Sequence, residues 1–147
     1  MSSTHLSLHY HLVFGTKNHA PIIERQWRPK LHAYLGGIIK ANDGVAESIG
    51  GVADHVHLLV GLRATHRLSD MLRELKAGSS GWVHQELRIR SFEWQEGYGA
   101  FTVSASQRDA VRSYIENQDE HHRTKTFREE YVELLRLSGV DFDPRYV

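Results

Sequence analysis

The chain has 147 residues, of which 40% are hydrophobic and 24% are charged, so its composition is that of one folded domain and not of a disordered segment. It contains no cysteine, which excludes disulfide scaffolds, thiolate metal sites and thiol catalysis. The chain has 18 lysines and arginines and 18 aspartates and glutamates, so it lacks the net positive charge typical of proteins that bind nucleic acid over their whole surface. The lack of a long apolar run and of a secretory signal pattern predicts a cytoplasmic protein.

The charge is unevenly distributed along the chain, and histidine is unusually common. Residues 63–90 carry six basic and three acidic side chains, and the whole chain has 11 histidines. An excess of three basic groups is small for a surface that binds nucleic acid. From charge alone, a nucleic-acid contact and a solvated helix face are both open interpretations of this segment.

Hydrophobic periodicity predicts the first half of the secondary structure. From residue 5 to residue 15, apolar and polar side chains alternate, which is typical of a strand with one buried face. Helical spacing follows over residues 24–42. Alternating segments at residues 45–52 and 56–60, with two glycines in the first of them, predict a hairpin.

The second half of the chain begins with a helix that extends to about residue 87 and that Thr65 or Ser69 could cap. Residues 98–103 predict a fourth strand. Ser104 and Gln107 then match a capping box, which predicts a helix from about residue 107 to 122. A short amphipathic helix is expected over residues 127–137.

The order of these elements, βαββαβ followed by helices, predicts an α+β fold: a ferredoxin-like antiparallel sheet with additional C-terminal helices, in a single domain over residues 1–147. The economical packing puts helices on one face of the sheet and leaves the other face open. The first and third strands are neighbours at the centre of such a sheet. Fold alone does not define the chemistry.

The sharpest local feature is His55-Val56-His57 on the third predicted strand. Histidines two residues apart on a strand project from the same face, close enough to share a metal ion. The apolar residues that alternate with them would point into the core and hold the pair rigidly. Ordinary histidines on the polar face of a strand are the alternative interpretation.

Two other histidine groups compete with this pair. His9 and His11 have the same spacing on the first strand, so the two pairs are expected to flank one site on the open face of the sheet. His121 and His122 are consecutive on a helix and point roughly 100° apart, so they cannot chelate a metal ion as a pair. We expect a surface role for at least one of those two.

Tyr114 and Gln118 lie four residues apart, on one face of the predicted helix. From spacing alone, Tyr114 is either a structural residue of the hydrophobic core or a nucleophile. In the second case the carboxamide oxygen of Gln118 beside it could bind a hard metal ion. A phenol has a pKa of about 10, so a nucleophilic tyrosine needs a metal or a base nearby. Tyr98, between two glycines, is the rival nucleophile, although its place on a strand favours a structural role.

Together these residues resemble the single-tyrosine HUH transposases, small insertion-sequence enzymes that include the REP-associated tyrosine transposases and act on single-stranded DNA. The family's His–hydrophobic–His strand is matched by His55-Val56-His57, and its tyrosine helix is matched by Tyr114 with Gln118 one turn on. Four further stretches are similar, at residues 10–17, 51–60, 75–80 and 94–99. The resemblance therefore covers about residues 5–131.

The resemblance implies a homodimer, in which the tyrosine helix of one protomer often completes the site of the other. It also implies a divalent metal, Mg²⁺ or Mn²⁺, held by His55, His57 and Gln118, with no small-molecule cofactor and no membrane. Tyr114 would cleave and rejoin single-stranded DNA with hairpin ends through a 5′-phosphotyrosine. Imidazoles and a carboxamide without a carboxylate suit Mn²⁺ or Zn²⁺ better than Mg²⁺.

The residues that would contact DNA are less evident than the reacting ones. Basic side chains expected to contact phosphates are Lys17, Arg63, Arg73 and Lys76. Trp94 or Phe101 could stack on an unpaired base. From the sequence alone, a structural or solvated role is the favoured alternative for each of these residues.

Three rival functions share some of these features. A domesticated relative would bind or cleave chromosomal hairpin repeats with the same motifs. A catalytically inactive hairpin-binding module is disfavoured because His55, His57, Tyr114 and Gln118 are all present. A metal-binding protein unrelated to DNA has only the histidines in its favour, and it would show no salt-sensitive affinity for single-stranded DNA.

Overall fold

The structure is a computed structural model that describes residues 3–147. Its four strands form one antiparallel sheet in the order β2-β3-β1-β4. The strands are β1 (His9–Gly15), β2 (Val45–Val52), β3 (His55–Gly61) and β4 (Gly99–Val103). The predicted α+β class and the central pairing of the first and third strands are confirmed, since β1 and β3 are neighbours.

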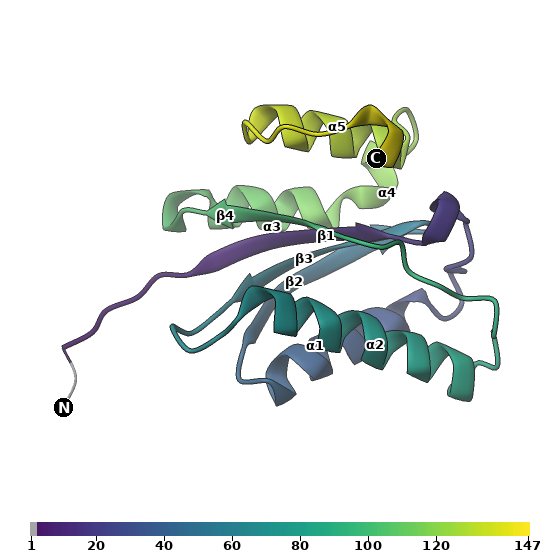
Figure 1. Ribbon diagram of the computed structural model, residues 1–147, viewed down its shortest axis with the longest axis horizontal. Coiled ribbons are helices and arrows are strands. Elements are labelled where there is room, and N and C mark those ends of the chain that lie inside the picture. Colours follow the sequence, from purple (N-terminus) through teal and green to yellow (C-terminus); the bar gives the residue numbers. More distant parts are fainter. Residues whose placement is uncertain (1–2) are drawn as a thin grey trace.

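Helices α1 (Arg28–Ala41) and α2 (Leu68–Glu86) cover one face of the sheet (Figure 1). The main hydrophobic core lies between them and the strands, and includes Leu12, Leu58, Leu35 and Leu75, all fully buried. Each such side chain contributes about 1.5–3 kcal/mol when it leaves water. Pro29 lies in the first turn of α1, where its missing N–H costs no helical hydrogen bond.

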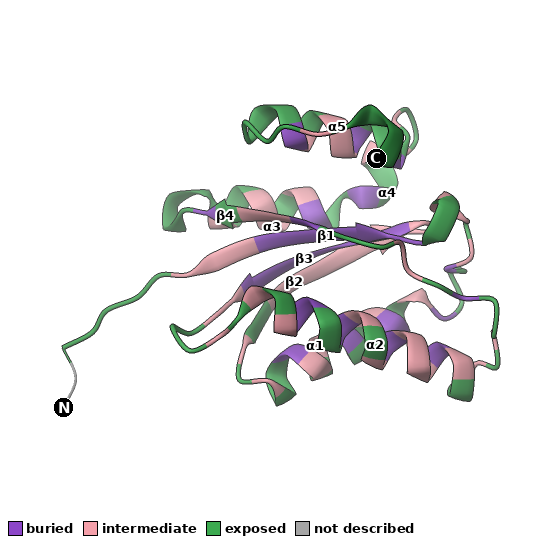
Figure 2. Cartoon of the chain, viewed as in Figure 1, coloured by how far each residue is buried: buried purple, intermediate pink, exposed green. Residues whose placement is uncertain are grey.

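The expectation that the other sheet face stays open was wrong. Helices α3 (Arg108–Glu116), α4 (Gln118–His121) and α5 (Phe127–Leu137) lie on that side of the sheet (Figure 1). Leu59, Val103 and Ile115 form a second buried cluster between the sheet and α3. Figure 2 shows runs of consecutive buried residues along β1 and β3, and because neighbouring side chains on a strand point to opposite faces, both faces are covered there. The alternation was misleading because the histidines on this face are buried through contacts with one another and with these helices.

The helix expected over residues 107–122 is interrupted at Asn117, which ends α3 with a backbone φ of −103° and ψ of 28°. The Asn117 side chain donates to the carbonyl of Ser113 at 2.8 Å, which satisfies an end group of α3. Helix α4 then starts at Gln118. The break therefore lies between Tyr114 and Gln118, the two residues expected on one helical face.

The predicted helix caps were also wrong. Ser104 precedes a short 3-10 helix, η2 (Ala105–Gln107), and its side chain makes no capping hydrogen bond. Helix α2 begins after Arg67 and not after Thr65 or Ser69. The capping box belongs to α5, where the Thr126 side chain accepts from the Glu129 N–H and the Glu129 side chain accepts from the Thr126 N–H. Two other short 3-10 helices are η1 (Lys17–His19) and η3 (Pro144–Tyr146).

Over residues 3–147, no helix has both the length and the apolar character needed to cross a membrane.

Candidate active site

The site begins with two histidines on the central strand β3. His55 and His57 project from the same face, both are fully buried, and their ring centroids are 5.0 Å apart. Val56, Leu58 and Val60 alternate with them and are buried in the main core on the opposite face. The strand therefore fixes both imidazoles from behind, as its two-residue period requires.

A neighbouring group holds the Nδ1 atom of each imidazole. His55 Nδ1 donates to the Asp54 carboxylate at 2.8 Å. His57 Nδ1 lies 2.7 Å from His11 Nε2 on the adjacent strand β1. His11 thus joins the site as expected from the pairing of β1 and β3. His9 does not, because it contacts Glu47 at 2.9 Å at the far end of the strand.

Tyr114 and Gln118 reach the histidines from helices α3 and α4. The Tyr114 ring centroid is 5.7 Å from that of His57, and Gln118 Oε1 accepts from His55 Nε2 at 2.9 Å. Helix α3 can lie this close to the sheet because β2 has a glycine there: a Cβ on Gly50 would be 2.2 Å from the Ile115 carbonyl oxygen. The sequence-predicted set of His55, His57, Tyr114 and Gln118 therefore meets within a single chain.

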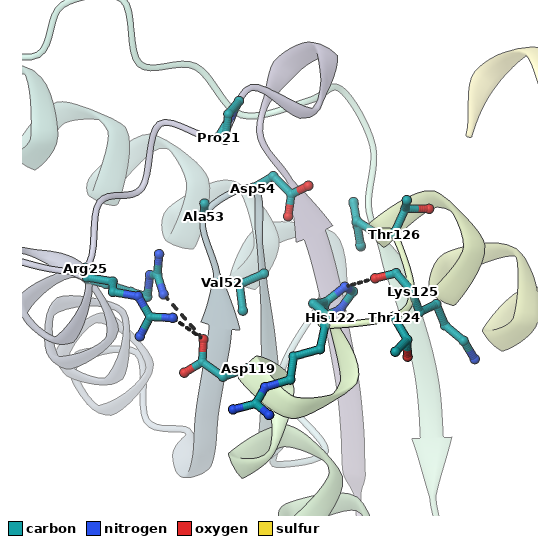
Figure 3. A pocket seen from close by; sticks show the side chains of 13 residues that line it. Pro21, Arg25, Val52, Ala53, Asp54, Asp119, His122, Thr124, Lys125 and Thr126 are labelled. Atoms are coloured by element: carbon teal, nitrogen blue, oxygen red, sulfur yellow. Dashed lines mark hydrogen bonds and ion pairs between the residues drawn. The ribbon is translucent and has the colours of Figure 1, made fainter.

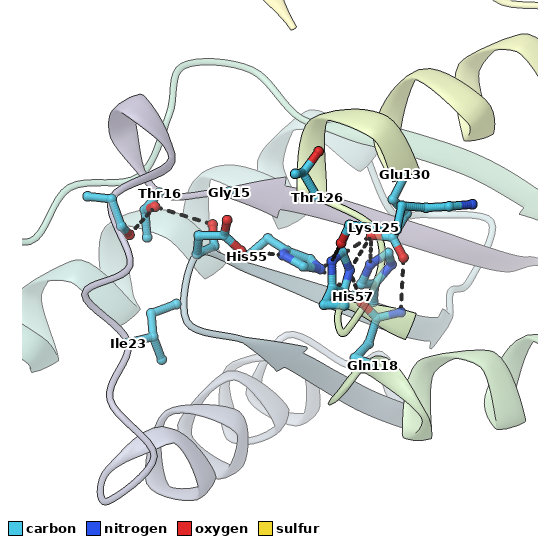
Figure 4. A network of polar contacts seen from close by, with 12 residues as sticks. Gly15, Thr16, Ile23, His55, His57, Gln118, Lys125, Thr126 and Glu130 are labelled. Carbon is cyan, nitrogen blue, oxygen red and sulfur yellow. Dashed lines mark hydrogen bonds and ion pairs between the residues drawn. The ribbon is translucent and has the colours of Figure 1, made fainter. Parts of the chain in front are cut away.

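Glu130 on α5 lies at the centre of this group, and the sequence analysis did not identify it (Figure 4). It is 2% exposed, and its Oε1 atom accepts from His57 Nε2 at 2.9 Å and lies 3.3 Å from His55 Nε2. Its Oε2 atom accepts from the Tyr114 hydroxyl and from Gln118 Nε2. One signal in the sequence could have indicated that Glu130 is buried: it lies one turn after Phe127, on the apolar stripe of a short helix.

His122 is the second residue that the sequence analysis missed. Its Nε2 atom lies 3.1 Å from Glu130 Oε1 and 3.1 Å from Gln118 Oε1. The adjacent His121 points elsewhere and packs against the Tyr114 ring, with centroids 4.6 Å apart. As expected, the two histidines do not act as a pair, but the side chain of His122 is nine-tenths buried in the site.

The charges in the cluster compensate one another. Burial alone would lower the pKa of His55, but hydrogen bonds to Asp54 and Glu130 outweigh it and raise that pKa to about 9. Burial dominates at His57 and lowers its pKa to about 4. The pKa of Glu130 would rise on burial, but hydrogen bonds from His122, His55 and His57 hold it well below its usual range. Glu130 is therefore a carboxylate.

Tyr114 is protonated in this arrangement. Burial, followed by the hydrogen bond to the Glu130 carboxylate, raises the pKa of its hydroxyl above the usual value. The hydroxyl points toward the group formed by His57, Gln118 and Glu130. Attack by this oxygen would therefore require a change in local charge, such as a bound cation supplies.

A divalent cation fits this group of side chains. His55, His122 and Glu130 could hold a metal ion, since their ligand atoms lie within 4.8 Å of one another. Imidazole nitrogens and carboxylate or carboxamide oxygens are ligands of Mn²⁺ and Zn²⁺, and the carboxylate also suits Mg²⁺. The carboxylate supplies the hard anionic ligand that the sequence-predicted set lacked.

A pocket of about 960 Å³ opens beside the site, between the loop before α1 and the loop before α5 (Figure 3). Asp54 and His122 line it, and so do basic side chains that the sequence analysis did not single out: Arg25, Arg28, Arg123 and Lys125. Arg25 and Arg28 contact Asp119, with nitrogen–oxygen distances of 3.3 and 3.9 Å. The pocket can thus receive an anionic chain next to the histidines.

The four predicted phosphate contacts do not gather at this site. Arg73 and Lys76 lie on α2, across the sheet from Tyr114. Lys76 donates to the carbonyls of Gln95 and Gly97, so it fixes the loop before β4. Lys17 pairs with Glu93 at 3.2 Å, and Arg63 is exposed in the loop after β3.

The three aromatic alternatives have other contacts. Tyr98 lines a separate pocket with Tyr131 and His19, away from His57. Trp94 packs against Phe14 and donates to the Ser79 hydroxyl at 2.9 Å, which indicates a structural role. Phe101 lies on β4 with its ring centroid 6.2 Å from that of His11.

Comparison with known proteins adds independent findings. A family model described as "Transposase IS200 like" matches residues 4–118. The chain is 26% identical to the ISDra2 transposase TnpA of Deinococcus radiodurans over an alignment of 117 residues that covers 76% of this chain and 84% of that protein. The matched segment ends at Gln118, so it includes Tyr114 and both β3 histidines, whereas His122 and Glu130 lie beyond it.

Two solved structures share the fold. One is a crystal structure of a candidate transposase from Deinococcus radiodurans, with a TM-score of 0.65 and 26% identity; the match covers 80% of this chain and 95% of that one. The other is a REP-associated tyrosine transposase bound to a REP hairpin, with a TM-score of 0.60 and 12% identity, covering 83% of this chain and 74% of that one. The second likeness concerns the fold alone.

Proposed function

The chain belongs to the family of IS200-like transposases, and on this premise we propose that it cleaves and rejoins single-stranded DNA through a tyrosine that becomes joined to the DNA. Membership of the family makes it a DNA-processing enzyme. The finer proposal assigns Tyr114 as the nucleophile and His55, His57 and Gln118 as metal ligands. The observation that carries it is the convergence of these four side chains in one buried cluster.

The metal would be Mg²⁺ or Mn²⁺. When bound, it would polarise the scissile phosphodiester and offset negative charge on the phosphate oxygens, a Lewis-acid effect of several kcal/mol. The Nε2 atoms of His55 and His57 support this assignment, since both lie within 3.3 Å of one oxygen of Glu130. Asp54 contacts Nδ1 of His55 and His11 contacts Nδ1 of His57, which orients both rings for ligation through Nε2.

Tyr114 would attack the phosphorus in line. The bond from its phenolic oxygen to phosphorus forms as the bond from phosphorus to the 3′ oxygen breaks, and the phenolic proton is balanced by the proton on the released 3′-hydroxyl. The products are a 5′-phosphotyrosine and a free 3′ end. Because the new linkage keeps the energy of the ester, a second 3′-hydroxyl can reverse the step, and strand exchange needs no ATP.

The substrate would be single-stranded DNA with hairpin ends. The pocket beside His122 supports an approach for one strand, because Arg25, Arg28, Arg123 and Lys125 supply positive charge along it. Lys17, Arg63, Arg73 and Lys76 remain proposed contacts for more distant parts of the DNA. A homodimer is also proposed, and the convergence of Tyr114 and His57 within one chain supports a site completed in cis.

The proposal is tested by incubating the protein with a pool of single-stranded hairpins that have randomised flanks, with Mn²⁺, with Mg²⁺ or with chelator. We expect a covalent protein–DNA adduct on a denaturing gel that requires the metal and is lost in Tyr114→Phe. The matched control is Tyr98→Phe, which should keep the adduct because Tyr98 lies in a separate pocket. An adduct that survives in Tyr114→Phe would overturn the assignment. Salt-sensitive hairpin binding without any adduct would favour a catalytically inactive binding module.

A further inference from the structure

One oxygen atom occupies the centre of the site. Glu130 Oε1 lies 2.9 Å from the Nε2 atom of His57, 3.1 Å from that of His122 and 3.3 Å from that of His55. Gln118 Oε1 lies 2.9 Å from His55 Nε2 and 3.1 Å from His122 Nε2. Three imidazole nitrogens thus surround Glu130 Oε1, and those of His55 and His122 also face Gln118 Oε1. Figure 4 shows Glu130 and Gln118 beside His55 and His57.

The opposite nitrogens of the rings determine what this centre requires. His55 Nδ1 donates to the Asp54 carboxylate at 2.8 Å, and His122 Nδ1 donates to the Lys125 carbonyl at 2.7 Å. Both of these oxygens only accept, so Nδ1 of each ring keeps its proton, and Nε2 is the nitrogen that can bind a metal ion. The Nε2 atoms of His55 and His122 face the carboxylate of Glu130 and the carboxamide oxygen of Gln118. A cation binds imidazole lone pairs and an anion together, so it can take the place of the proton that His55 Nε2 shares with these oxygens.

We propose that Glu130 and His122 are ligands of the divalent cation, in addition to His55, His57 and Gln118. This inference rests on the proposed function of the site. Both added residues lie beyond the segment that the family model matches, so they are a feature of the C-terminal part of this chain. A carboxylate is the ligand that hard cations such as Mn²⁺ and Mg²⁺ prefer. The site therefore binds its metal before any DNA phosphate arrives.

The structure of α5 supports this role, because it positions Glu130 firmly. The Thr126–Glu129 capping box fixes the first turn of the helix. Phe127 stacks flat on His55, with ring centroids 4.2 Å apart and an interplanar angle of 6°. Glu130 follows one turn after Thr126 and faces the sheet. A ligand held in this way loses little conformational entropy on binding a metal.

Glu130 also links the metal ligands to the nucleophile. While Oε1 faces the three imidazoles, Oε2 accepts from the Tyr114 hydroxyl and from Gln118 Nε2 at 3.2 Å. The same carboxylate therefore sets the separation between the phenolic oxygen and the cation site. Without helix α5, the ligand set would consist of imidazoles and a carboxamide, and Tyr114 would lack this contact.

The test is a titration of the full-length protein with Mn²⁺ in the absence of DNA, with the free ion measured by electron paramagnetic resonance. We expect Glu130→Gln to weaken Mn²⁺ binding by at least about tenfold, since even groups that only support a ligand change metal affinity by about 10–100-fold. The control is Glu133→Gln, an equally conservative change at an exposed position of the same helix, which should leave the affinity unchanged. Far-UV circular dichroism verifies that each variant is folded.

His122→Gln gives a second measurement should Glu130→Gln fail to fold, and we expect the same loss of Mn²⁺ affinity. Wild-type affinity in a folded Glu130→Gln protein would overturn the inference, and so would the absence of Mn²⁺ binding by the wild type. A failure of the proposed function alone would give a different result. Mn²⁺ binding would then still depend on Glu130, but no DNA would form an adduct with Tyr114.

Discussion

Gly50 allows helix α3 to lie against β2, so an alanine at this position should displace the helix that carries Tyr114. The added Cβ would be 2.2 Å from the Ile115 carbonyl oxygen and 3.0 Å from Ile115 Cγ2. Because a Cβ essentially never approaches another heavy atom closer than 3.0 Å, helix α3 must retreat by about 0.8 Å. The neighbouring Tyr114 moves with it, away from His57 and Glu130.

This displacement has two measurable consequences. Overpacking of a well-filled interior costs about 1–3 kcal/mol, so Gly50→Ala should lower the free energy of unfolding by that amount in urea titrations. A misplacement of about 1 Å can slow catalysis about 10²-fold, so the rate of covalent adduct formation should fall to a similar extent. Hairpin affinity should change less, since no residue of α3 lines the pocket that contains Arg25 and Arg123.

The matched control is Gly37→Ala, because no atom lies within 4 Å of the Cβ position of Gly37. Gly37 lies inside α1, so its replacement by alanine should stabilise the protein by about 0.5–1 kcal/mol and leave adduct formation unchanged. A Gly50→Ala protein with wild-type stability and wild-type adduct rate would refute the close packing of α3 on β2.

Two further predictions concern stability. Burial, and to a lesser extent the charge of Arg28, lowers the pKa of His32 from the usual 6.5 to about 4. As the pH falls from 6.5 to 4, the unfolded chain takes up a proton at His32 that the native protein does not bind. The free energy of unfolding should therefore fall by up to about 3 kcal/mol over this range. His32→Leu should therefore lose less stability than the wild type between pH 7 and pH 4.5 in urea unfolding, and equal losses would contradict the burial of a neutral His32. Thr126→Ala should cost about 1 kcal/mol because it removes the cap of α5. Ser104→Ala should cost much less, since Ser104 makes no capping bond; equal costs would show that the cap was wrongly assigned.

The sheet and its central pair of histidines were predictable because their pattern is local. His55 and His57 alternate with the buried Val56 and Leu58, and a period of two determines which face each side chain occupies. The neighbouring position of β1 followed from the order of the elements. These features depend on few long-range contacts, so the sequence was sufficient to predict them.

The covered second face and the role of Glu130 depend on tertiary contacts that no local pattern encodes. Glu130 is buried only because α5 folds back over β3 and the histidines there satisfy its charge. A glutamate on a short amphipathic helix would ordinarily be exposed. The break at Asn117 was equally hidden, since the residues on either side of it favour a continuous helix.

The central claim is that Tyr114 becomes covalently joined to DNA, and the most direct measurement is to identify the modified residue. The adduct would be digested with nuclease and trypsin and examined by mass spectrometry. Cleavage after Arg112 and Arg123 gives a peptide in which Tyr114 is the only tyrosine. We predict that this peptide carries a nucleotide joined through a 5′-phosphate to Tyr114. A nucleotide on another tyrosine, such as Tyr98 or Tyr131, would contradict the account.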